Sequence, residues 1–223
     1  MYLPRHFEMG DLDTVGGFVD SVGSADLVTV GADGSPASSL VPVLWERHGA
    51  DPEDRRFGTL LAHVARMNEQ WYDVTPGQRV LAIVHGPQAY VSPSWYAAKA
   101  EHGRVVPTWN YSAVHLSGTV AQLVDDADEL RDLVTRLTDR HELDRPDPWS
   151  VDDAPQAYLA GQLKAIRGVV IQVDAVEAKA KLSQNRSAAD RDGVVAGLLA
   201  DGDPDGVRVA DAMARLRTDE LPS

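Results

Sequence analysis

Cysteine is absent from this chain of 223 residues, which excludes disulfide bonds and metal sites built on thiolates. No apolar run approaches the roughly 20 residues that a membrane-spanning helix requires. The opening residues, MYLPRHFEMGDLD, lack the apolar core that follows the basic start of a secretory signal peptide. We therefore expect a cytoplasmic protein without a membrane partner.

Positive charge is scarce. The chain has 21 lysines and arginines against 34 aspartates and glutamates, a formal net charge of −13 at pH 7. Such a surface repels a polyanion unless a local basic patch overrides the overall charge. The basic residues form no long block, so direct binding to DNA is disfavoured.

Several catalytic motifs are also missing. The chain has no G-x-G-x-x-G after a strand, no P-loop and no G-x-S-x-G, which disfavours dinucleotide-binding, P-loop and α/β-hydrolase proteins. His63, His85 and His115 fall in three separate predicted strands, without the helical spacing of a zinc site or evident carboxylate partners. A catalytic triad could be drawn from Ser92 or Ser94, but nothing in the sequence fixes its geometry.

The apolar pattern predicts a mainly β, α+β protein of six or seven strands with helical connections. Alternating and β-branched runs predict strands at 26–32, 36–46, 57–65, 79–86, 88–92, 111–124 and 165–183. Helical spacing and capping residues predict helices at 11–22, 125–143, 154–164, 187–200 and 207–217, with short turns after Asn68 and Ser92 and a loop at 49–56. Such strands close best as a small antiparallel barrel, because closure removes exposed edges. We expect one domain over 1–223, with 187–223 as a helical appendage.

Two polar clusters lie in the first half of the chain. Ser38 and Ser39 interrupt a strand, where small hydroxyls leave room for a ligand or simply mark an exposed edge. His63, Arg66 and Asn68 lie at a strand end and a helix start. An arginine beside helix N–H groups suits a phosphate, although it could equally pair with one of the many acids.

Aromatic residues are few but concentrated. Five of the fourteen lie in HGPQAYVSPSWY (85–96) and VPTWNYSAVH (106–115): Tyr90, Trp95, Tyr96, Trp109 and Tyr111. Aromatic side chains with polar tips suit the wall of a ligand pocket, but a core or a dimer interface would use them as well.

A basic, amide-rich run, KAKLSQNRS, lies between the last predicted strand and a helix. It is the clearest local exception to the acidic composition and offers donors to an anion. A solvated loop is the alternative. The candidate residues in this run are Lys181, Gln184, Asn185 and Arg186.

Together these segments resemble the PaiB-type, FMN-binding negative transcriptional regulators. The resemblance rests on MYLPRHF, LAHVARMNEQW, HGPQAYVSPSWY, VPTWNYSAVHLSG and KLSQNRSAADRDGV, which occur in order from the first residue to about residue 194. It implies the FMN-binding split barrel shared with pyridoxamine-phosphate-oxidase-like proteins, usually a homodimer with FMN at the interface.

The resemblance also implies which residues contact FMN. Ser38 and Ser39 would face the flavin ring, His63, Arg66 and Asn68 would hold the ribityl and phosphate groups, and Trp109 and Tyr111 would wall the pocket. The run containing Lys181, Gln184, Asn185 and Arg186 would contact the phosphate or the ring edge. The expected function is a negative transcriptional regulator or flavin-linked redox sensor. An FMN-dependent oxidoreductase and a carrier of flavin or a haem-like ligand are alternatives.

Overall fold

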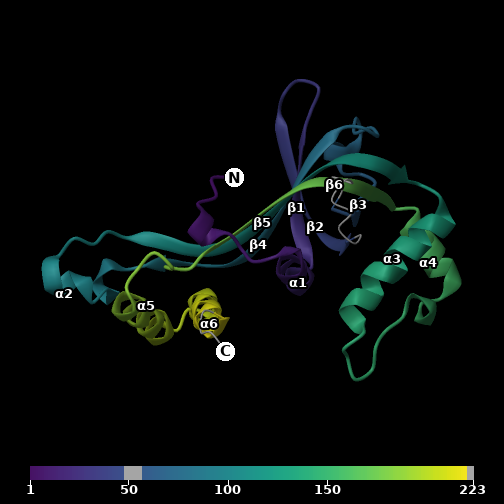
Figure 1. Ribbon diagram of the computed structural model, residues 1–223. Helices are drawn as coiled ribbons and strands as arrows, with labels where there is room; N and C mark the ends of the chain where they lie inside the picture. The colour runs from purple at the N-terminus through teal and green to yellow at the C-terminus, as the bar shows by residue number, and fades with distance from the viewer. Residues whose placement is uncertain (48–56, 220–223) are drawn as a thin grey trace. The chain divides into compact units, whose positions relative to one another are not determined.

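The structure is a computed structural model that describes residues 1–47 and 57–219 (Figure 1). The predicted loop at 49–56 lies outside the described residues. Within the described part of the chain, the strands are β1 (Ser24–Val30), β2 (Pro36–Glu46), β3 (Thr59–Ala65), β4 (Arg79–Val91), β5 (Thr108–Val124) and β6 (Ile166–Lys181). The helices are α1 (Leu12–Val22), α2 (Ala98–His102), α3 (Ala127–Glu142), α4 (Gln156–Leu163), α5 (Ala188–Asp201) and α6 (Pro204–Asp219). Short 3-10 turns are η1 (Arg5–Phe7), η2 (Glu69–Trp71), η3 (Pro93–Trp95) and η4 (Val151–Asp153).

The six strands form a closed barrel in the order β1-β2-β3-β6-β5-β4, which confirms the predicted antiparallel barrel. Two predicted runs, 79–86 and 88–92, are one strand, because β4 continues through Gly86 and Pro87. Proline removes a donor from the ladder but does not stop a strand where that donor is not needed. The predicted caps Asn68, Ser92 and Ser187 each accept a backbone N–H at the start of a helical turn.

The chain divides into two compact units. The barrel unit comprises residues 16–84 and 115–177, and the helical unit comprises residues 1–15, 85–114 and 178–223. Strands β4, β5 and β6 contribute residues to both units. The predicted single domain over the whole chain stays a prediction.

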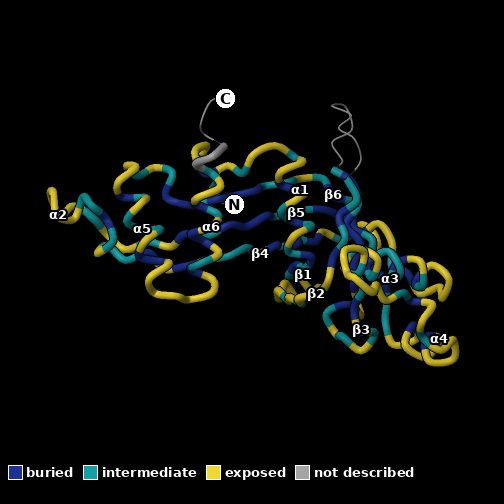
Figure 2. Tube along the Cα trace, turned by 90° about the horizontal axis from the view of Figure 1, so that it is seen from below, coloured by how far each residue is buried: buried dark blue, intermediate teal, exposed yellow. Residues whose placement is uncertain are grey.

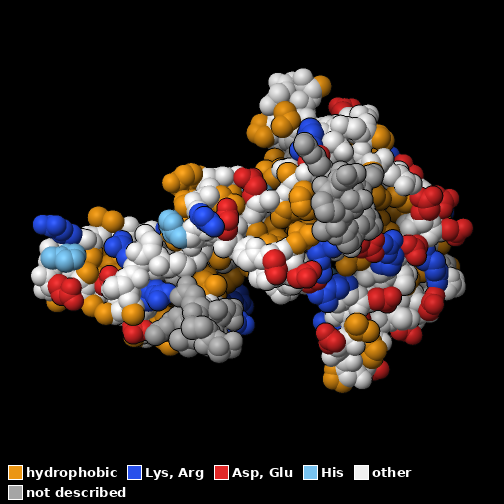
Figure 3. Space-filling model, in the orientation of Figure 1, with side chains coloured by type: hydrophobic (Ala, Val, Ile, Leu, Met, Phe, Trp, Pro, Cys, Tyr) orange, Lys and Arg blue, Asp and Glu red, His pale blue; other side chains and the backbone are white. Residues whose placement is uncertain are grey.

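In the barrel unit, alternate strand residues are buried, as in β2, where Val41, Val43 and Trp45 are interior. The pattern recurs as bands of buried residues along the strands in Figure 2. Helices α3 and α4 pack together (Figure 1) around an apolar cluster that includes Leu130 and Leu163. On the face shown in Figure 3, acidic and basic side chains are intermingled over these two helices.

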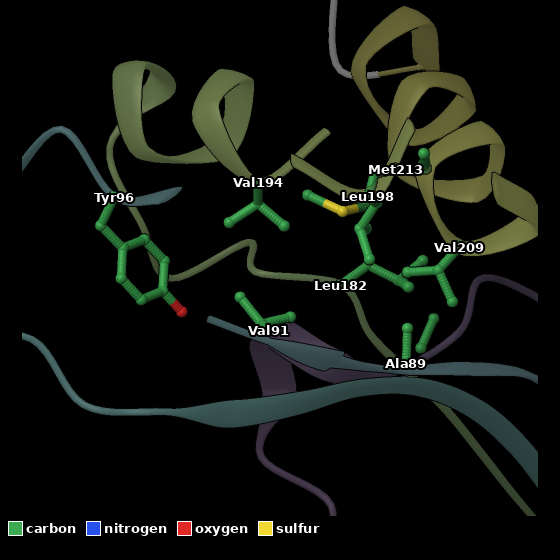
Figure 4. Close-up of a cluster of buried hydrophobic side chains, with 10 residues drawn as sticks. Ala89, Val91, Tyr96, Leu182, Val194, Leu198, Val209 and Met213 are labelled. Carbon is green, nitrogen blue, oxygen red and sulfur yellow. The ribbon is translucent and has the colours of Figure 1, made fainter. Parts of the chain in front are cut away.

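In the helical unit, α5 and α6 pack on the strand residues Ala89, Val91 and Ala180 through an apolar core drawn in Figure 4. Two glycines one turn apart on α5 make room for Trp95. A Cβ on Gly193 would lie 2.0 Å from the Trp95 carbonyl oxygen, and one on Gly197 would lie 2.3 Å from its ring. The spacing Gly193-x-x-x-Gly197 therefore fixes how η3 lies on α5.

Candidate functional site

The two serines of β2 point to opposite faces, because side chains alternate along a strand. Ser38 is exposed and its hydroxyl donates weakly to Asp26, at 3.4 Å. Ser39 is half-buried and faces the same way as the interior residue Val41. The two serines therefore cannot both face one ligand on the same side of the strand.

Ser39 and Asn68, which were predicted in separate clusters, are joined by a hydrogen bond. The Asn68 amide donates to the Ser39 hydroxyl at 2.7 Å, and that hydroxyl donates to Gln70. The Gln70 amide in turn donates to Leu27 O, at 2.8 Å, and to the Thr29 hydroxyl, at 3.1 Å. Gln70 was not predicted from the sequence, because nothing in its local pattern shows that it joins η2 to β1 and β2.

Arg66 also lies in the barrel unit, where it contacts two backbone carbonyls and a carboxylate. Its guanidinium donates to the carbonyls of Lys164 and Ile166, at 3.1 and 3.0 Å, and forms an ion pair of 2.7 Å with Asp125. Arg167 binds the same carboxylate through two bonds of 3.0 Å. The hydrogen bonds from Arg167 and, secondarily, Arg66 lower the pKa of Asp125 below its ordinary value. In this arrangement Arg66 ties the end of β3 to the start of β6.

His63 lies on β3 opposite Gly168 of β6. Burial lowers the pKa of its imidazole, which favours the neutral ring. Its Nδ1 atom is buried and has no hydrogen-bond partner among the described residues. The imidazole nitrogen is therefore free to accept or donate a hydrogen bond, although it is covered by protein atoms.

The helical unit contains a group of three cations at the end of β6, which we call the cation cluster: Lys179, Lys181 and Arg186. Lys179 is 6% exposed, and its ammonium group donates to Tyr2 O at 2.9 Å. It also lies 5.3 Å from the centre of the Tyr111 ring, with Phe7 nearby at 5.9 Å. Aromatic faces thus offset part of the cost of burying this charge.

The other two cations are more accessible. The Lys181 ammonium donates to the Thr108 hydroxyl and to the carbonyl of Trp109. The Arg186 guanidinium lies 4.7 Å from the centre of the Tyr96 ring. Burial, and then the positive charges of Lys179 and Arg186, lower the pKa of Lys181.

No carboxylate among the described residues pairs with any member of the cation cluster. This is unusual in a chain with a net charge of −13. Cations held together without a directly paired acid favour the binding of an anion.

The rest of the basic run shapes the turn after β6. Ser183 has a φ of 66°, which is uncommon for a residue other than glycine, and its hydroxyl is bonded to the buried Asn110 at 2.9 Å. Gln184 makes local bonds to Ala180 O and Leu182 N, so it stabilises this turn. Asn185 is exposed.

Trp109 and Tyr111 have separate surroundings. Tyr111 contacts Lys179. Trp109 is 51% exposed and lines a pocket whose other walls include Asp201, Asp203 and Asp205. Those carboxylates would repel the phosphate of FMN, so the flavin contact of Trp109 stays a prediction.

Comparison with known proteins identifies the family. Residues 1–175 match the sequence model of the family described as "Putative FMN-binding domain". The chain belongs to this FMN-binding family. It is 32% identical over 213 residues to the Bacillus subtilis "Protease synthase and sporulation protein PAI 2", covering 96% of each protein. It is also 33% identical over 184 residues to an uncharacterized protein of Aspergillus fumigatus, covering 69% of this chain and 70% of the other.

Solved structures of other proteins have the same fold as this FMN-binding family member. The FAD and haem binding protein of Mycobacterium smegmatis superposes with a TM-score of 0.54 at 17% identity, covering 84% of this chain and 78% of that one. The flavocytochrome Anf3 of Azotobacter vinelandii gives a TM-score of 0.51 at 15% identity, covering 80% and 72%. At these identities the similarity establishes the fold alone.

The donor set of the helical unit fits FMN. The phosphate of FMN carries nearly two negative charges and needs cationic donors when it leaves water. The cation cluster supplies such donors without an acid partner among residues 1–47 and 57–219, and Tyr111 and Tyr96 lie beside it. The Arg66 site, in contrast, already contains the carboxylate of Asp125.

Proposed function

We propose that this chain is a flavin-linked redox sensor in gene regulation, with the phosphate of FMN bound by Lys181 and Arg186 of the cation cluster. The observation that supports this phosphate site is the absence of a described carboxylate partner for these cations. A phosphate dianion placed between Lys181 and Arg186 would offset the repulsion that lowers the pKa of Lys181. When bound, FMN supplies reversible one- and two-electron chemistry.

The regulatory part of the proposal rests on the Bacillus subtilis relative, whose name refers to protease synthesis and sporulation and which matches over nearly its whole length. The described residues include no cluster of three or more histidines, cysteines or carboxylates suited to a metal. The ring gains negative charge on reduction, and an FMN anchored through its phosphate by Lys181 and Arg186 would carry that charge close to the start of α5.

Direct reading of DNA by α5 and α6 is not part of this proposal. These helices carry aspartates such as Asp201 and Asp211, and Arg208 is already paired with Asp205 at 3.0 Å. Such a mixed surface does not form the basic stripe that a DNA-reading helix presents. We propose a protein partner as the output, with DNA as the alternative.

The absorption spectrum of the purified chain tests FMN binding, because bound FMN gives flavin bands.

The redox-sensor role is tested by comparing the oxidised protein with the anaerobically reduced protein, in partner capture and in gel shifts at physiological salt. A sensor gives different binding in the two states. Identical binding in both states, with flavin bound, would remove the sensor role but keep FMN binding.

We also propose a homodimer. In the single chain, Leu40 on β2 is 69% exposed and Val30 on β1 is 55% exposed, both on the outer side of neighbouring strands. Exposed large apolar side chains on a sheet commonly become covered in oligomers. Leu40→Asp should shift the chain toward a monomer in sedimentation experiments, whereas a monomeric wild-type chain would refute the dimer.

An FMN-dependent oxidoreductase is the second candidate, because the helical unit has an open pocket of about 430 Å³ with aromatic walls that could seat a substrate. Anaerobic mixing with NADH or NADPH distinguishes the two functions. Rapid bleaching of the flavin favours an enzyme, and slow bleaching favours the sensor.

A further inference from the structure

The pocket beside Trp109 has a composition of its own. Its volume of about 430 Å³ lies in the range of small-molecule sites. Three aromatic and three acidic residues dominate its lining: Tyr90, Trp95, Trp109, Asp201, Asp203 and Asp205. All of them belong to the helical unit.

The aromatic side is partly fixed and partly open. Trp95 is held against α5 by the space that Gly193 and Gly197 leave for it. Tyr90 and Trp109 are 49% and 51% exposed, so their rings remain available to a ligand. Several aromatic rings around one space attract a cation, because the face of each ring carries partial negative charge.

Two of the three carboxylates on the acidic side have partners among the described residues. Asp203 caps α6 by accepting the Gly206 N–H at 2.9 Å, and Asp205 pairs with Arg208. Asp201 forms no hydrogen bond or ion pair within the part of the chain that the structure describes. It lies in the last turn of α5, where the helix dipole is negative and a cation is favoured.

We propose that this pocket binds a small organic cation, an alkylamine or a quaternary ammonium compound, between the aromatic rings and the carboxylate of Asp201. The proposal does not rest on the proposed function, since FMN is an anion and the three aspartates disfavour it here. The pocket and the cation cluster thus select ligands of opposite charge.

Choline and 3,3-dimethylbutan-1-ol are suitable probes, because they have nearly the same shape and differ in the charge of the central atom. Isothermal titration of the full chain, with its flavin as purified, should show choline binding about ten-fold more tightly than the neutral alcohol. The preference should decrease as salt is added. Equal binding of the two probes, or no binding of choline, overturns the proposal.

Two variants locate the binding. Trp109→Leu and Asp201→Asn should each weaken choline binding by about three- to five-fold. The controls are Trp149→Leu, another half-exposed tryptophan outside the pocket, and Asp211→Asn, an exposed aspartate on α6. Unchanged binding in Trp109→Leu and Asp201→Asn, or an equal loss in the controls, overturns the proposal.

A second copy of this chain could cover the same aromatic surface. Sedimentation of wild type and Trp109→Leu detects this outcome. A dimer that Trp109→Leu dissociates, together with no choline binding, assigns the pocket to self-association and refutes the cation site.

Discussion

Two cationic regions of the molecule have opposite surroundings, and each contains residues predicted to contact FMN: Arg66 in the barrel unit, and Lys181 and Arg186 in the helical unit. In the barrel unit, Arg66 and Arg167 share the carboxylate of Asp125, and Arg79 contacts Asp174. In the helical unit, the cation cluster has carbonyls, a hydroxyl and aromatic rings as partners, and no described carboxylate. A cation paired with an acid stabilises the fold, whereas unpaired cations held close together favour binding of an anion.

The largest expected effect is on FMN binding in the cation cluster. Lys181→Met and Arg186→Met should each weaken FMN binding by about ten- to a hundred-fold, because each removes a charged donor to the phosphate. Fluorescence quenching of FMN measures the affinity. Lys99→Met, which removes an exposed lysine of α2, is the control and should change little.

The next effect is on the packing that supports the cluster. Gly197→Ala places a Cβ 2.3 Å from the Trp95 ring and should lower the free energy of unfolding by about 1–3 kcal/mol. Gly161→Ala on α4, with no atom within 4 Å, should be neutral or slightly stabilising. Urea unfolding measures the free energy of unfolding of both variants. An equal change in the two variants would show that Trp95 does not pack closely on α5.

A substitution of Arg66 should have the opposite pattern of effects from those in the cation cluster: it should lower stability and leave FMN binding nearly unchanged. Arg66→Met removes bonds to two carbonyls and an ion pair, so it should lower the free energy of unfolding by about 1–2 kcal/mol. If Arg66 does not contact FMN, the affinity for FMN should change less than about three-fold. Loss of a hydrogen bond to the charged phosphate would change it far more. A large loss of FMN affinity in a folded Arg66→Met variant would instead support the phosphate role predicted from the sequence.

The smallest effect concerns pH. The folded state has a pKa for Asp125 below its ordinary value of 3.8, so its stabilising effect is present above 3.8 and is lost as pH falls through the folded pKa. The carboxylate is 48% exposed, so Asp125→Asn should cost less than about 1 kcal/mol at neutral pH. Urea unfolding should show that the stability difference between wild type and Asp125→Asn decreases at acid pH. A difference that persists at acid pH would mean that the carboxyl group stabilises the fold by packing and not by its charge.

Much of the fold could be predicted from residue patterns. The alternation in 36–46 gives the bounds of β2, and the caps Asn68, Ser92 and Ser187 mark helical turns, because these signals act over a few residues. The continuity of β4 through Pro87 could not be predicted, since it depends on neighbouring strands.

The candidate site was harder to predict for the same reason. The sequence identifies Arg66 and Lys181 as cations near turns, but it does not show which of them has an acid nearby. Asp125 is 59 residues from Arg66 in the chain and yet lies 2.7 Å from it. Gln70 and Asn110 were not predicted as contacts because their partners are 31 and 73 residues away.

The most direct test is the preference for FMN over riboflavin, which lacks the phosphate. The wild-type chain should bind FMN at least about a hundred-fold more tightly than riboflavin, given two charged donors. In the Lys181→Met/Arg186→Met double variant the two affinities should become nearly equal, while riboflavin binding itself changes little. A preference for FMN that survives in the folded double variant would contradict the assignment of the phosphate to the cation cluster.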